Sequence, residues 1–168
     1  MVSIKQVFFS FILPIIVLII VPSLILWLGE GRTIFTILNS NLILLVIGFI
    51  VLGMGLLLWL DCVVLFYKIG KGTLFPSKKV ETKSLVIVGP YKYVRNPMII
   101  GVIITSVGES LVFGSMWILF FAFCFLIGNL IYIPLSEEKH LIERFGEEYI
   151  HYKKCVRGWI PKLKAYEY

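Results

Sequence analysis

The sequence predicts an all-α integral membrane protein with about four transmembrane helices, a C-terminal helical hairpin and an amphipathic cytoplasmic tail helix. Of its 168 residues, 59% are hydrophobic, and the mean hydropathy is +0.95. This composition excludes a soluble globular domain. A helix needs roughly 20 apolar residues to cross a bilayer. Four stretches reach or approach that length, namely residues 7–28, 42–67, 98–113 and 116–135.

The first two stretches, within residues 7–67, are predicted to be anchoring transmembrane helices. The first is longer than the apolar core of a signal peptide, and it contains Pro14 and Pro22. It also lacks a small-residue cleavage site before Gly29, so we expect it to be retained. The glycines of the second stretch are typical of helices that pack closely in lipid.

The basic residues predict the topology. The net charge is +6, and of the sixteen Lys and Arg residues seven lie in the loop 68–97 and seven in the tail 136–168. The positive-inside rule places this loop, this tail and the N-terminus in the cytoplasm. We expect one multi-pass, membrane-embedded domain, residues 1–168, with its basic residues near anionic lipid headgroups. No helix carries base-reading residues, so nucleic acid is not an expected partner.

The last two apolar stretches, residues 98–135, are predicted to form a tight antiparallel hairpin. Gly114 and Ser115 are the only plausible turn between them, and Glu109 is expected to be a turn or cap residue. Beyond the hairpin, SEEKHLIERFGEEYIHYKK alternates charge with apolar residues at helical spacing. The apolar face of this tail helix is expected to lie on the membrane surface or to fold back over the hairpin.

The cysteines and histidines predict neither a disulfide framework nor a metal site. Cys62 and Cys124 fall within apolar stretches and Cys155 in the tail, without paired spacing. His140 and His151 are too few for a metal cluster, and we interpret both as surface residues.

A group of polar residues precedes the third apolar stretch, in GPYKYVRNPMIIG, residues 89–101. Pro97 suits the first turn of a helix, and Asn96 is a natural N-cap before it. In the tail, IYIPLSEEKHL places Glu137 and Glu138 just after the fourth stretch, where two neighbouring carboxylates favour a cationic partner.

In an antiparallel hairpin, the start of one helix meets the end of the other. We therefore expect Tyr91, Arg95 and Asn96 to lie close to the two glutamates. Such a cluster can bind a zwitterion, with carboxylates on an ammonium group and Arg or Asn on a carboxylate. The alternative is structural: a helix cap and a partly exposed ion pair, which contributes about 0–1 kcal/mol.

The order and spacing of these motifs resemble a known family. GPYKYVRNPMIIG is followed about forty residues later by EE, then by FGEEYIHYKK and WIP. This pattern, over residues 89–161, is similar to the integral-membrane methyltransferase group that contains isoprenylcysteine carboxyl methyltransferase and the phospholipid N-methyltransferases. The resemblance implies a membrane helix bundle that binds S-adenosylmethionine at its cytoplasmic face and opens sideways to a lipid-like or membrane-partitioned substrate.

The resemblance also implies which residues bind the cofactor. The family signature falls on Arg95 to Met98, its acidic pair on the two glutamates, and a Gly-x-Gly on the second apolar stretch. Helix packing explains that Gly-x-Gly equally well. The expected cofactor-binding residues are Tyr91, Arg95, Asn96, Pro97, Met98, Gly101, Glu137, Glu138, Gly53 and Gly55.

The acceptor side of the site is less defined. A carboxylate acceptor is already ionised and would be oriented by Arg144 or Arg157, the expected catalytic residues, whereas an amine requires a tail Glu or Tyr as base. Tyr149, Tyr152 and Trp159 are expected to bind substrate, although interfacial aromatics commonly act as anchors. Asn96 replaces the histidine usual in the carboxyl methyltransferase branch, and Arg157 is displaced by one position.

Two other functions remain open from the sequence. Membrane sterol reductases resemble this group in their C-terminal part and use a nicotinamide cofactor instead. A small non-enzymatic membrane scaffold or transporter subunit is also possible. The polar residues gather on one expected face of the membrane, as an enzyme with a cytoplasmic cofactor requires.

Overall fold

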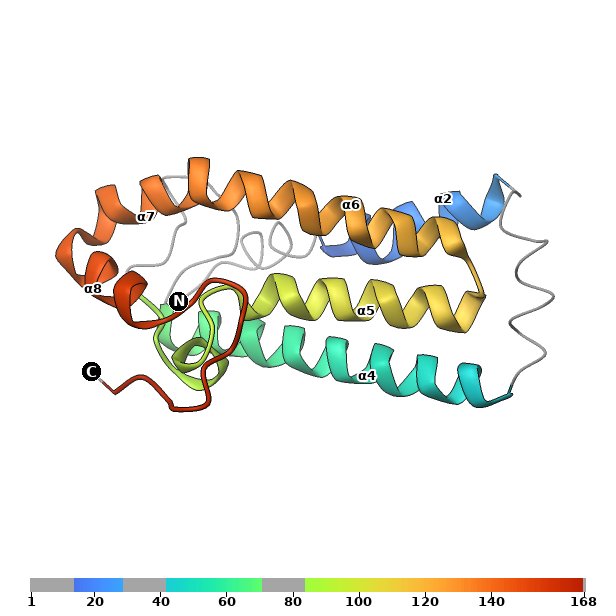
Figure 1. The fold of residues 1–168 in the computed structure, drawn as a ribbon, viewed down its shortest axis with the longest axis horizontal. Coiled ribbons are helices and arrows are strands. Elements are labelled where there is room, and N and C mark those ends of the chain that lie inside the picture. Colours follow the sequence, from blue (N-terminus) through green and yellow to red (C-terminus); the bar gives the residue numbers. More distant parts are fainter. Residues whose placement is uncertain (1–13, 29–41, 71–83, 168) are drawn as a thin grey trace.

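The computed structural model describes residues 14–28, 42–70 and 84–167, and every regular element in these ranges is helical (Figure 1). Three single turns, η1, η2 and η4, are π-helical, and η3 is a 3-10 turn. The elements are η1 Ile16–Ile20, α2 Val21–Trp27, α4 Leu42–Leu65, η2 Phe66–Gly70, η3 Gly89–Lys92, α5 Pro97–Phe113, α6 Met116–Tyr132, η4 Ile133–Glu137, α7 Glu138–Phe145 and α8 Glu147–Cys155.

Two helices are long and apolar enough to cross a membrane, Leu42–Ile69 and Met116–Phe145. Two shorter apolar helices accompany them, Ile16–Trp27 and Pro97–Phe113. The expected all-helical fold with long apolar helices is confirmed. Four crossings stay a prediction, because the 17 residues of α5 extend only about 26 Å against a hydrocarbon core of about 30 Å. The start of the first predicted helix, residues 7–13, lies outside the described residues.

Helices α4 and α5 make the most extensive contact between described elements, and glycines allow it. A Cβ atom on Gly108 would lie 2.4 Å from the backbone nitrogen of Leu52, and one on Gly55 would lie 2.5 Å from that of Thr105. Small residues let helix backbones approach closely in lipid. The two helices therefore form a rigid pair that supports the rest of the fold.

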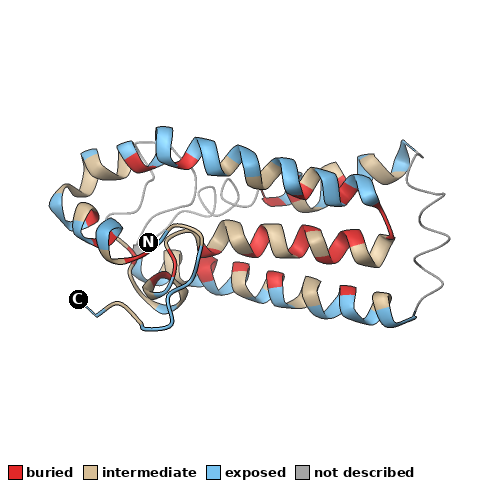
Figure 2. Cartoon of the chain, in the orientation of Figure 1, coloured by how far each residue is buried: buried red, intermediate tan, exposed pale blue. Residues whose placement is uncertain are grey.

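An apolar junction joins the described helices near the C-terminal part of α4 and the N-terminal part of α5. Val17, Trp59, Val63 and Val102 are buried there, and Phe121 packs against them. The outward faces of α4 and α6 are instead apolar and exposed, as Figure 2 shows. Exposed apolar faces on long helices are what lipid tails cover.

The predicted turn between α5 and α6 is confirmed. Gly114 ends α5 in the left-handed region, with φ 61°, and Ser115 caps α6 by accepting a hydrogen bond from the Ile118 nitrogen. The expectation that Glu109 is a turn or cap residue is wrong. Its side chain lies within α5 and is buried, because the helix runs on for one more turn before Gly114.

The fourth apolar stretch was predicted to end at residue 135, but the helix itself does not end there. Helix α6 continues through η4 into α7 and ends at Phe145. Pro134 lacks the N–H that an α-helix needs, and the wider π-turn accommodates it. The helix ends instead just before Gly146, whose φ is +54°.

The apolar residues of the tail pack on one another. Tyr149, Tyr152 and Val156 of the α8 region are buried together, and Phe145 of α7 packs against them. The remaining partly buried members of this tail cluster are Leu85, Ile87, Leu141, Ile142, Cys155 and Tyr166. The tail was expected to form one helix on the membrane surface or over the hairpin. It is instead two helices, α7 and α8, separated at Gly146, whose apolar side chains pack on one another and on Leu85 and Ile87. A position on the membrane surface stays a prediction.

The close contact of α4 and α5 predicts a specific effect of a single methyl group. Gly108→Ala places a Cβ against the backbone of Leu52, so we expect a loss of about 1–3 kcal/mol in the free energy of unfolding in detergent micelles. Gly128→Ala is the control, because a Cβ there meets nothing within 4 Å. Equal unfolding free energies for the two variants would contradict the observed helix contact.

Candidate functional site

The polar segments gather at one end of the helices. Residues 84–96, the start of α7, and α8 with the following tail all lie at the end opposite the α5–α6 turn (Figure 1). Residues far apart in the sequence therefore meet beside the start of α5.

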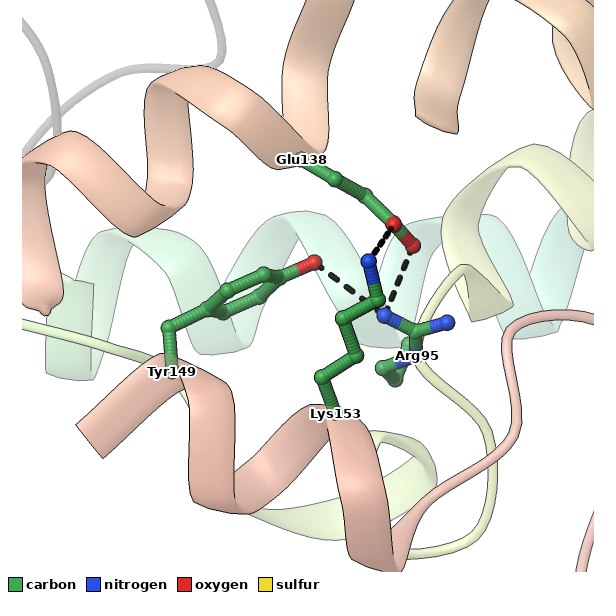
Figure 3. Close-up of polar contacts among 4 residues, drawn as sticks. All are labelled: Arg95, Glu138, Tyr149 and Lys153. Atoms are coloured by element: carbon green, nitrogen blue, oxygen red, sulfur yellow. Dashed lines mark hydrogen bonds and ion pairs between the residues drawn. The ribbon is translucent and has the colours of Figure 1, made fainter. Parts of the chain in front are cut away.

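A buried carboxylate organises this end. Glu138, at the start of α7, is 5% exposed. Its Oε1 lies 2.7 Å from Arg95 Nη1, and its Oε2 lies 2.6 Å from Lys153 Nζ. Arg95 Nη1 also donates a hydrogen bond of 3.3 Å to the Tyr149 hydroxyl (Figure 3). The predicted proximity of Arg95 and Glu138 is confirmed, and the side chains of this pair are only 12% and 7% exposed.

The π-turn η4 gives Glu138 its orientation. The Glu138 N–H bonds the Ile133 carbonyl, so the two residues lie one wide turn apart, and both are buried. In an α-helix, five residues correspond to a rotation of roughly 140° away from the starting face. Without the π-turn, Glu138 would point away from Arg95.

The tail holds the Arg95 segment through its backbone. The Arg95 nitrogen donates to the Arg157 carbonyl at 2.9 Å, and the Asn96 nitrogen donates to the Gly158 carbonyl at 3.2 Å. Asn96 occupies the N-cap position of α5, but its side chain makes no capping hydrogen bond. Its side chain is therefore not used by the helix that follows.

Buried tyrosines connect α8 to the η3 turn. The Tyr152 hydroxyl donates a 2.6 Å hydrogen bond to the Tyr91 carbonyl. Tyr91 itself is buried in an apolar cluster with Cys62 and Val86, and Phe66 packs edge-on against its ring. This cluster fixes the position of η3, just before Arg95.

Burial keeps these phenols protonated. It raises the pKa of Tyr149 to about 12, with the Glu138 charge acting in the same direction and Arg95 against it. Burial also raises the pKa of Tyr152 above its ordinary range and that of Tyr91 well above it. Near neutral pH the three tyrosines act as hydrogen-bonding groups, not as bases.

Two buried donors at the site have no hydrogen-bond partner among the residues that the structure describes. They are Nε of Arg95 and Nδ2 of Asn96. A Cβ on Gly158 would lie 3.3 Å from Arg95 Nη2 and 3.5 Å from Asn96 Nδ2, so the absence of a side chain leaves both groups open on that side. Two adjacent donors of this kind fit an anionic group such as a carboxylate.

A comparison with protein families identifies the chain. Residues 43–148, more than half of the sequence, match the model of the phospholipid methyltransferase family. The chain belongs to this family. No curated protein and no solved structure matches the chain. Family members are S-adenosylmethionine-dependent methyltransferases with lipid acceptors, which excludes the reductase and scaffold alternatives.

The match to the phospholipid methyltransferase family begins earlier than the resemblance seen in the sequence. It includes the Gly-x-Gly of α4, whose two glycines differ in surroundings. Gly55 faces the backbone of α5, whereas a Cβ on Gly53 would meet nothing within 4 Å. A Cβ on Gly101 would lie 2.9 Å from the Trp59 nitrogen, so this glycine also packs α5 on α4. The cofactor roles of these three glycines stay predictions.

The other predicted cofactor residues surround the Arg95 and Glu138 pair. Pro97 is the buried first residue of α5. Met98 packs against the apolar junction around Trp59 and also against the cluster around Tyr91. Glu137 precedes Glu138 in the π-turn and is exposed. It is therefore the more accessible member of the acidic pair.

The predicted catalytic and substrate residues lie in the tail. Arg157 is exposed and contributes its backbone carbonyl, not its guanidinium, to the Arg95 segment. Arg144 lies on α7, with its guanidinium carbon 4.8 Å from the Phe145 ring centroid. Trp159 is half-buried, whereas Tyr149 and Tyr152 are each 3% exposed and contact protein groups. Their roles in catalysis and substrate binding stay predictions.

Sequence reasoning missed Lys153. It follows Tyr149 by one turn of α8, so both side chains reach Glu138 or its partner from the same side. The signal was present as the spacing of four residues, but one lysine among many in a basic tail does not stand out.

Glu138→Gln removes the negative charge with which both Arg95 and Lys153 form ion pairs. Breaking a buried ion pair leaves its partner uncompensated, so we expect a loss of about 3 kcal/mol in the free energy of unfolding. Glu143→Gln, at an exposed position of α7, should change it by less than about 0.5 kcal/mol. Denaturant titration in mixed micelles measures both. A change as small for Glu138→Gln as for Glu143→Gln would refute a structural role for the pair.

The raised pKa of Tyr149 predicts a stability change at high pH. Because folding raises this pKa from 10.0 to about 12, the folded state holds the proton more tightly than the unfolded chain. The resulting stability is fully present below about pH 10 and is lost as pH rises through about 12. Tyr149→Phe should have a flatter dependence of unfolding free energy on pH over this range. Parallel curves for the two proteins would show that Tyr149 ionises normally.

Proposed function

We propose that this protein methylates the headgroup amine of a phospholipid, using S-adenosylmethionine bound at the Arg95 and Glu138 cluster. The observation that carries the proposal is the buried cluster itself, whose donors on Arg95 and Asn96 lack partners within the described part of the chain. Family membership supplies the methyl donor and a lipid acceptor. The proposal keeps the predicted topology of about four crossings with both termini in the cytoplasm, where the cofactor is available.

Each polar group of the cluster has a role in holding the amino-acid part of the cofactor. Arg95 Nε and Asn96 Nδ2 are assigned to its carboxylate, because both are buried donors without an acceptor. Glu137 is assigned to its ammonium, because Glu138 already faces a cation on each oxygen. Charge-assisted hydrogen bonds contribute about 1.5–3 kcal/mol each, so these contacts supply a substantial part of the binding free energy.

When bound, S-adenosylmethionine supplies an electrophilic methyl group, and the chain supplies binding, orientation and exclusion of water. The acceptor amine would have to lose its proton so that its lone pair could take the methyl group, and the sulfonium sulfur would leave as the neutral thioether S-adenosylhomocysteine. The buried tyrosines do not accept that proton near neutral pH, because their pKa values are raised. Glu138 is held between two cations and is not assigned this role. We assign this proton to water at the membrane surface.

An exposed carboxylate at the site predicts the effect of its removal on cofactor binding. Glu137→Gln should weaken S-adenosylmethionine binding by roughly 10-fold or more, because one charge-assisted hydrogen bond is lost. Glu143→Gln is the matched control on the adjoining helix and should bind like the wild type. Isothermal titration calorimetry on detergent-purified protein measures both. Failure of well-folded wild type to bind would overturn the proposed site.

The acceptor chemistry has its own test. The purified protein is incubated with methyl-labelled S-adenosylmethionine and either phosphatidylethanolamine or a prenylated cysteine with a free carboxylate. We expect label in the phospholipid, stable to mild base because it is on nitrogen. Label that mild base releases as methanol, from the prenylated substrate alone, would replace amine methylation by carboxylate methylation at the same site.

A further inference from the structure

The segment after α8 combines cations with exposed apolar side chains. Residues 156–164 contain three Lys and Arg residues and no acidic residue. Within this segment Ile160 is 62% exposed and Leu163 is 106% exposed, while Trp159 is half-buried. Exposed aliphatic side chains between cations are unfavourable in water but suit the boundary between lipid headgroups and acyl chains.

The same segment is attached to the functional site. The nitrogens of Arg95 and Asn96 donate to the carbonyls of Arg157 and Gly158, and the Lys162 nitrogen donates to the Tyr93 carbonyl at 2.9 Å. Farther along, the Tyr166 nitrogen bonds the Lys92 carbonyl. The segment therefore follows residues 92–96 and lies at the end of the bundle where α5 begins (Figure 1). We expect the surface of the bilayer at that level, because the apolar helix α5 begins there.

We propose that residues 157–164 form an anchor that docks on an anionic bilayer surface, with Ile160 and Leu163 among the upper acyl chains. Charge selects this occupant: Lys164 and Arg157 are exposed and complement anionic headgroups, whereas the Lys162 ammonium bonds the Cys155 carbonyl. Each lysine near an anionic surface strengthens association by about fivefold. Tyr93, 41% exposed beside this anchor, is an interfacial aromatic of the usual kind.

Docking of the anchor has a consequence for the site. Its backbone carbonyls accept hydrogen bonds from the nitrogens of Arg95 and Asn96. A docked anchor therefore keeps the Arg95 segment in a fixed position beside the lipid headgroups. Anionic lipid is thus expected to strengthen cofactor binding without touching the cofactor. This consequence rests on the proposed function, whereas docking itself does not.

The primary test reports docking without any cofactor. Leu163→Cys is labelled with bimane in a Cys124→Ser/Cys155→Ser background, since the third cysteine, Cys62, is fully buried. The protein is placed in nanodiscs with brominated acyl chains and anionic headgroups. We expect strong loss of bimane fluorescence at position 163 and little loss for the control label at exposed Glu148→Cys. Equal quenching at the two positions would overturn the anchor, and so would quenching at neither.

The second test measures charge selection and the link to the site. The measured quantity is the ratio of quenching at position 163 in anionic and in zwitterionic nanodiscs. Lys164→Gln should lower this ratio by about fivefold, whereas Lys139→Gln, at an exposed position of α7, should not. Wild type should bind S-adenosylmethionine more tightly in anionic nanodiscs, and Lys164→Gln should lose part of that gain. If no cofactor binds in either lipid, the proposed site fails while the quenching result still decides the anchor. Identical lipid preference for Lys164→Gln and wild type would refute charge selection.

Discussion

The buried carboxylate of Glu138 is the point at which three parts of the chain are joined. It receives Arg95 from the segment before α5 and Lys153 from α8, while its own backbone continues the long helix that begins at Met116. A carboxylate in such surroundings is costly to bury without partners, and the two cations together offset that cost. The shape of the polar end of the molecule depends on this one group.

Two kinds of packing support that group. The pair formed by α4 and α5 is held by backbone contacts at glycines, which leave little room for movement. The tail is held by side chains, with Tyr149 and Tyr152 serving as buried core and as hydrogen-bonding groups at once. The family match ends at residue 148, so all but the first two residues of α8, and the whole anchor, lie beyond the part that matches the family model. The tail therefore completes a site whose other residues the matched region supplies.

The electrostatics of the site favour binding over proton transfer. Buried phenols with raised pKa values donate and accept hydrogen bonds but do not ionise near neutral pH. The carboxylate at the centre is already paired, and the free donors are on Arg95 and Asn96. A reaction in which the cofactor brings the reactive group needs this kind of site, because the protein has only to orient its reactants and exclude water.

The sequence by itself determined the helical membrane fold, the tight turn at Gly114 and the meeting of Arg95 with Glu138. These follow from local signals: apolar length, turn residues, and the antiparallel order of two neighbouring helices. Only the tertiary structure decided that α6 runs on through Pro134, that Glu138 rather than Glu137 is buried, and that Lys153 is its second partner. A π-turn changes the face on which every later residue lies, and its presence depends on what that face can contact. Partners brought together by packing across many residues leave no periodic pattern in the sequence, so they become visible only in the folded chain.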